Sequence, residues 1–107
     1  MAISFLNEGV LKYFMREGEV YTFRLNRRIQ TGKTLMNDRR GGPKIADVDV
    51  REVGEYRVWD LRPFLDKSSF RTLAAWFMAI RELQGSRIVS MNTRGWLYKV
   101  MLVNFKQ

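Results

Sequence analysis

The sequence predicts a single α+β domain, built as a small curved sheet or open barrel of four to six strands with one strong helix and one weaker helix. Three observations predict this fold class. The length of 107 residues fits one domain. Segments rich in β-forming residues recur along the chain. Apolar side chains between residues 70 and 83 recur at helical spacing.

The first half of the chain is expected to form a short helix and then strands. Apolar residues share one face of a helix over residues 9–16, and Gly18 is suited to end it. The expected elements that follow are a strand at 19–28, a turn at 30–33, a short strand at 34–36 and an exposed loop at 37–43.

Alternation divides the strand at 19–28 into two faces. Tyr21 and Phe23 share one face, and Thr22 and Arg24 share the other. Because Phe is usually buried, we expect the aromatic face to pack in the core and the polar face to be free for function.

The second half is more amphipathic. Residues 44–53 alternate between apolar and charged side chains, which predicts an antiparallel strand with one solvent face. Residues 56–64 suit a turn or a single helical turn. The helix at 70–83 would be capped by Ser68 or Ser69. The final strand at 96–105 is apolar on both faces, so we expect it at the centre of the sheet.

Positive charge is concentrated in residues 16–44. This segment holds eight Lys or Arg against three Asp or Glu, so about +5 of the chain's net charge of +8 lies in it. Clustered cations beside aromatic residues favour a polyanionic partner, and nucleic acid is the commonest one.

The composition weighs against several other classes. The chain has no cysteine and no histidine. It therefore lacks thiolate chemistry, the usual general base at neutral pH and the commonest metal ligand, and we expect neither a metal nor a cofactor. No signal peptide and no apolar run long enough to cross a bilayer is evident, so we expect a cytoplasmic protein without a membrane partner.

Gly32-Lys33-Thr34 matches the end of a phosphate-binding loop. The full motif requires a glycine five residues before the Gly-Lys pair, and Arg27 stands there. A strand is also expected to follow, where the motif needs a helix. The sequence therefore favours a β-turn with an exposed lysine over a nucleotide-hydrolysing loop.

Several segments resemble the ASCH domains of the PUA-like superfamily, over nearly the whole chain. The matching residues are Gly18 followed by Thr22 and Arg24, Asp60-Leu61-Arg62-Pro63, Ser69-Phe70, Trp76, Ala79-Ile80 and the closing strand Gly95-Trp96-Leu97-Tyr98-Lys99-Val100.

The resemblance implies a PUA-like β-barrel of about five strands with two flanking helices, formed by residues 1–107 as one domain. It implies RNA binding, with Thr22 and Arg24 lining a cleft. Some members hydrolyse RNA or modified nucleosides with the help of a lysine in the Gly-x-Lys segment. Here that segment reads Gly18-Glu19-Val20-Tyr21 and has no lysine, so the resemblance favours binding over catalysis.

The sequence thus predicts a non-catalytic nucleic-acid-binding domain, with RNA favoured over DNA. The predicted contacts are Thr22, Arg24, Arg27, Arg28, Lys33, Arg39, Arg40 and Lys44. The alternative is a small hydrolase, either a ribonuclease or a modified-nucleoside amidohydrolase, in the same cleft. Its general base would be Glu17, Glu19 or a perturbed Lys33.

Overall fold

The computed structural model describes residues 3–4, 8–37, 43–83 and 88–105. Five strands form one sheet in the order β1-β3-β4-β5-β2, and all neighbours are antiparallel except β1 and β3. The α+β class is confirmed. The strands are β1 (Ile3–Ser4), β2 (Glu19–Arg24), β3 (Gly32–Asn37), β4 (Lys44–Arg57) and β5 (Arg94–Phe105). The helices are α1 (Glu8–Glu17), the 3₁₀ helix η1 (Val58–Lys67) and α2 (Leu73–Leu83).

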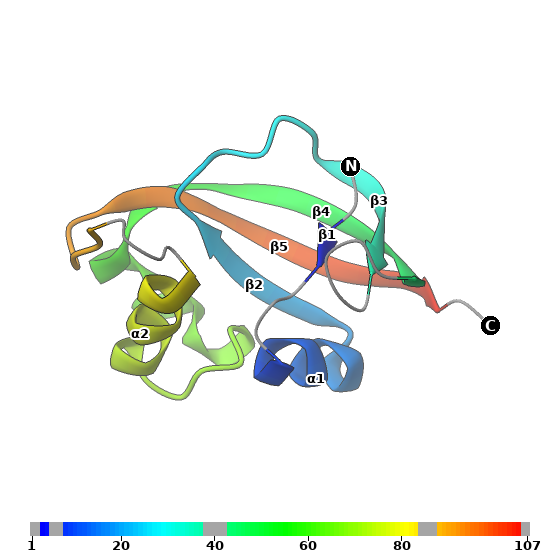
Figure 1. The fold of residues 1–107 in the computed structure, drawn as a ribbon, viewed down its shortest axis with the longest axis horizontal. Coiled ribbons are helices and arrows are strands. Elements are labelled where there is room, and N and C mark those ends of the chain that lie inside the picture. The colour runs from blue at the N-terminus through cyan, green and yellow to red at the C-terminus, as the bar shows by residue number, and fades with distance from the viewer. Residues whose placement is uncertain (1–2, 5–7, 38–42, 84–87, 106–107) are drawn as a thin grey trace.

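The sheet is open and does not close into the β-barrel that the ASCH resemblance implies, whereas the small sheet expected from the β-forming segments is present. Strands β1 and β2 are its two edges, and no pairing joins them in the described residues. Closing a barrel requires the edge strands to hydrogen-bond along their length. Here β1 pairs with β3 over only two residues. In Figure 1 the long strands β4 and β5 cross the molecule, α1 and α2 lie below them in this view, and α2 lies at the end where β5 begins.

One face of the sheet, called the inner face here, carries the first core cluster. Val20, Val50 and Val100 lie opposite one another on β2, β4 and β5 and are fully buried. Val10 and Phe14 of α1 pack into the same cluster. Gly18 ends α1 as expected, with φ of 80° and its N–H donating to the Phe14 carbonyl at 2.8 Å.

The outer face of β2 and β5 carries the second cluster. Phe23 and Leu97 pair across these strands and are buried against η1 and α2, so the core position predicted for Phe23 is confirmed. Tyr21, on the same face, is partly buried. The residues contributed by the helices are Val58, Leu61, Leu73, Trp76 and Ile80.

Several element boundaries differ from the predictions. Strand β3 begins at Gly32 rather than at residue 34, so Lys33 lies in a strand and not in the expected turn, and α2 begins at Leu73 rather than at residue 70. Strand β2 ends at Arg24 rather than at residue 28, and β4 continues four residues past Val53 through a register shift between Glu52 and Gly54. The turn expected at 56–64 is the ten-residue η1.

The N-terminus of α2 is capped by a residue other than the two predicted. The Ala75 N–H donates to Thr72 Oγ1 at 3.1 Å. The Ser68 hydroxyl instead donates to the Leu65 carbonyl at 2.8 Å and accepts from the Phe70 N–H at 3.1 Å, so it holds the preceding loop. Within the described residues no helix combines the length and the apolar character needed to cross a membrane.

Candidate nucleic-acid interface

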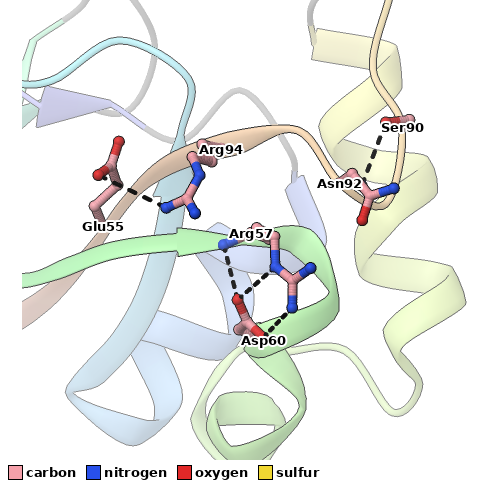
Figure 2. A network of polar contacts seen from close by, with 6 residues as sticks. All are labelled: Glu55, Arg57, Asp60, Ser90, Asn92 and Arg94. Carbon is pink, nitrogen blue, oxygen red and sulfur yellow. Dashed lines mark hydrogen bonds and ion pairs between the residues drawn. The ribbon is translucent and has the colours of Figure 1, made fainter.

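The inner face changes along the strands from apolar to polar to basic. Beyond the valine row, the next row across the sheet is Thr22, Tyr98 and Glu52. The row after that is Arg24, Trp96 and Glu55, and the last is Arg94 and Arg57. Because paired residues share a face, one surface extends from the core to the end of β4 and β5. Figure 2 shows that end, with Arg94 directed toward Glu55 and Arg57 toward Asp60.

Arg24 and Thr22 are the unusual residues of this face. Arg24 is half-buried, and neither its Nε nor Thr22 Oγ1 reaches water or has a hydrogen-bond partner in the described part of the chain. Burial lowers the pKa of the Arg24 guanidinium, and the nearby charge of Arg28 lowers it further. Buried polar groups almost always have partners, so two orphaned ones on the same face mark a place where an acceptor is missing, and a ligand can supply it when the side chains move to admit it.

The loop after β2 places two more arginines beside them. The Arg27 guanidinium donates to both Glu52 oxygens, from Nε at 2.8 Å and from Nη2 at 3.0 Å. The Arg28 N–H donates to the hydroxyl of Tyr98 at 2.6 Å. Tyr98 is fully buried, so this hydrogen bond ties the loop to the core of the sheet.

These loop residues form a pocket of about 370 Å³, lined by Arg27, Arg28, Ile29, Thr31 and Glu52. Hydrogen bonding from Arg27 keeps the pKa of Glu52 below its ordinary value, and a hydrogen bond from Tyr98 contributes in the same direction. Glu52 is therefore ionised, and of the described residues that line the pocket it is the one with a carboxylate. Together with its neighbours on the inner face, this pocket forms the arginine site, which consists of Thr22, Arg24, Arg27, Arg28, Glu52 and Tyr98.

The structure brings together four of the predicted contacts, Thr22, Arg24, Arg27 and Arg28, and separates two others from them. Lys33 is exposed and pairs with Asp49 on the outer face. Lys44 lies at the start of β4 and forms an ion pair with Asp47 at 2.7 Å.

Arg39 and Arg40 lie outside the described residues, so their role stays a prediction. The aspartates of β4 pair with cations of the same strand: Asp49 accepts from Arg51 Nε at 3.1 Å. These carboxylates belong to a solvated strand face.

Glu52, Tyr98, Arg57 and Arg94 belong to this surface but were not among the predicted contacts. The unusual position of Glu52 could have been recognised from the sequence. It continues the i, i+2 series of Val48 and Val50, so alternation assigns a charged residue to the core face. No comparable pattern singles out Tyr98, because β5 is apolar on both faces.

The carboxylates considered as general bases do not lie at the arginine site. Glu19 is on the outer face of β2, where Lys67 and Lys99 contact its two oxygens. Hydrogen bonding from Lys67 lowers the pKa of Glu19, which weakens it as a base near neutral pH. Glu17 is in the last turn of α1, 3.7 Å from the guanidinium of Arg16.

Comparison with models of protein families, with curated proteins and with solved structures found no match to this chain.

Proposed function

We propose that this chain is a non-catalytic nucleic-acid-binding domain, with RNA favoured over DNA, and that phosphate groups bind at the arginine site. The observation that carries the proposal is Arg24, whose buried Nε has no acceptor beside the equally unpartnered hydroxyl of Thr22. A phosphate oxygen is an acceptor that suits both groups, because guanidinium donors bind phosphate through short, charge-assisted hydrogen bonds.

The charge of the whole chain supports the same partner. At +8 the protein attracts polyanions over several ångströms, and among the described residues two arginines and one carboxylate line the pocket. Charge alone does not distinguish RNA from DNA. The preference for RNA rests on the resemblance to ASCH domains, and so does the assignment to that family.

A hydrolase in the same cleft is the alternative. A general base near neutral pH needs a carboxylate with a raised pKa, whereas the pKa of Glu52 is lowered by Arg27. Two features therefore support binding over hydrolysis. The pKa of Glu52 in the pocket is lowered, and the Gly-x-Lys segment has no lysine.

The proposal is tested by measuring the affinity of the protein for single- and double-stranded RNA and DNA at two salt concentrations. We expect affinity that falls steeply with salt. Arg24→Met keeps an unbranched side chain as far as the Nε position and removes the guanidinium. It should weaken binding about tenfold or more, as expected for a lost charge-assisted hydrogen bond.

Arg81→Met on α2 is the matched control, because Arg81 lies over the ring of Phe77 and away from the inner face of the sheet. This variant should bind within about twofold of the wild type, as expected for a screened surface charge. Equal losses in both variants would show that only net charge matters. No salt-sensitive affinity for any of the four polymers would reject nucleic-acid binding.

A further inference from the structure

Trp59 leaves 49% of its surface exposed, whereas Trp76 in α2 is 3% exposed. Its neighbours in η1, Val58 and Leu61, are fully buried. Single exposed apolar residues are common, but a large aromatic surface at a charged position is typical of a binding site. The function of Trp59 is therefore inferred from the residues near it.

The backbone on both sides of Trp59 is held rigidly. The Trp59 N–H donates to the Met91 carbonyl at 3.0 Å, and the Val58 N–H donates to the Thr93 carbonyl at 3.2 Å. The Asp60 carboxylate accepts from the Arg57 N–H and Nε at 3.2 Å and from its Nη2 at 3.3 Å (Figure 2). These hydrogen bonds link the residues two before and one after Trp59 in the chain. A ring that projects from such a frame loses little conformational entropy when it binds a partner.

Arginines belong to the same helix and to the strand end before it. In a 3₁₀ helix the side chains at i and i+3 eclipse, so Arg62 lies on the same side of η1 as Trp59. Arg62 is exposed and forms no hydrogen bond or ion pair within the described residues. Arg94 is 3.9 Å from Glu55, and both side chains are exposed, so this contact is weak and readily exchanged.

The position is also continuous with the arginine site. Arg94 pairs with Arg57, and Trp96, two residues further along β5, pairs with Arg24. Two residues of strand span roughly 7 Å. A strand of nucleic acid whose phosphate is bound by Arg24 can therefore reach the end of β4, where η1 begins.

We infer that Trp59 is a base-stacking platform and that the domain selects single-stranded over double-stranded nucleic acid. The inference rests on the proposed function. A base in a single strand can be unstacked and laid on the indole while Arg62 and Arg94 hold its flanking phosphates. In a duplex each base face is covered by its neighbours, so the platform adds nothing.

The test compares binding of a single-stranded RNA with binding of a duplex of the same sequence and length. Trp59→Ala should weaken binding of the single strand about tenfold, within the range of base-aromatic stacking, and leave duplex binding unchanged. Trp59→Phe keeps a ring and should remain within about threefold of the wild type. Met78→Ala removes an apolar residue of similar exposure, 51%, from α2 and should change neither affinity.

Circular dichroism of Trp59→Ala checks that the variant is folded. If it is not, Trp59→Leu, which keeps apolar bulk but has no aromatic face, takes its place and should lose the same affinity for the single strand. Equal losses for single strand and duplex, or unchanged binding of the single strand by the folded variant that lacks the ring, would overturn the platform while leaving the proposed function standing. Absence of any nucleic-acid binding by the wild type would overturn both.

Discussion

Glu52 shows how one residue sets the character of the arginine site. It occupies a position where the alternation of β4 places buried valines, and its carboxylate accepts both hydrogen bonds from Arg27. The ion pair positions Arg27 at the rim of the pocket, and it also offsets one of the positive charges that a phosphate would meet. Glu52 therefore favours order in the loop and opposes anion binding.

Glu52→Gln is expected to strengthen nucleic-acid binding several-fold, because the amide keeps the shape of the side chain and removes the negative charge that competes with phosphate for Arg27. Filter binding at low salt measures the change. Glu82→Gln at the end of α2 alters net charge by the same amount and is the control. An equal gain in the two variants would assign the effect to net charge alone, and weaker binding by Glu52→Gln would mean that the ion pair is needed to position Arg27.

At the scale of elements, the close approach of β2 and β5 determines where Arg24 lies. Gly95 of β5 faces the end of β2, and a Cβ added there would lie 2.6 Å from the Arg24 carbonyl oxygen and 2.7 Å from the ring of Phe23. One of these atoms is backbone and the other belongs to a buried ring, so neither can move away cheaply. The glycine permits the strand contact that carries the arginine site.

Gly95→Ala is expected to destabilise the fold by about 2 kcal/mol, since overpacking a well-packed site has costs of this size. It should also weaken nucleic-acid binding, because the end of β2 must shift. Gly18→Ala is the comparison: its Cβ would meet nothing within 4 Å, but its φ of 80° is unfavourable for alanine. We expect a loss of about 1 kcal/mol there, without a change in affinity once the protein is folded. Chemical denaturation and binding assays measure both effects, and a neutral Gly95→Ala would contradict the packing argument.

At the scale of the whole molecule, carboxylates joined to cations connect distant elements. Glu19 of β2 contacts Lys67 of η1 and Lys99 of β5. Lys67 lowers the pKa of Glu19, Arg27 lowers that of Glu52, and Arg57 lowers that of Asp60. A carboxyl group whose pKa is lower in the folded than in the unfolded state stabilises the fold when ionised.

The lowered pKa values of these carboxyl groups predict how the stability of the fold depends on pH. The contribution of such a group is fully present above its unfolded pKa, near 4.5 for Glu, and is lost as the pH falls through the lower folded value. We expect a nearly constant free energy of unfolding from pH 6 to 8, because the chain has no histidine, and a decline below about pH 4. Glu19→Gln should lose less stability on acidification than the wild type. A marked change between pH 6 and 8, or an identical acid response in Glu19→Gln, would contradict this account.

Much of the secondary structure could be predicted because it depends on neighbours in the sequence. The periodicity of α1, the glycine that ends it and the apolar character of β5, which lies between β4 and β2, are local properties, and each was confirmed. The extension of β4 could not be predicted, because the strand continues past Glu52 by means of a bulge opposite β5. Capping of α2 by Thr72 rather than Ser68 likewise depends on where the preceding loop places the serine hydroxyl.

Sequence patterns alone account for the α+β class, the excess of positive charge and the alternation that separates Thr22 and Arg24 from Phe23. Which cations share a surface depends on the tertiary structure. It joined Arg28 to Tyr98 across 70 residues, placed Glu52 beside Arg27, and moved Lys33 to the outer face. The physical reason is that strand register and sheet curvature arise from pairing between distant segments, whereas charge and side-chain periodicity are properties of each segment alone.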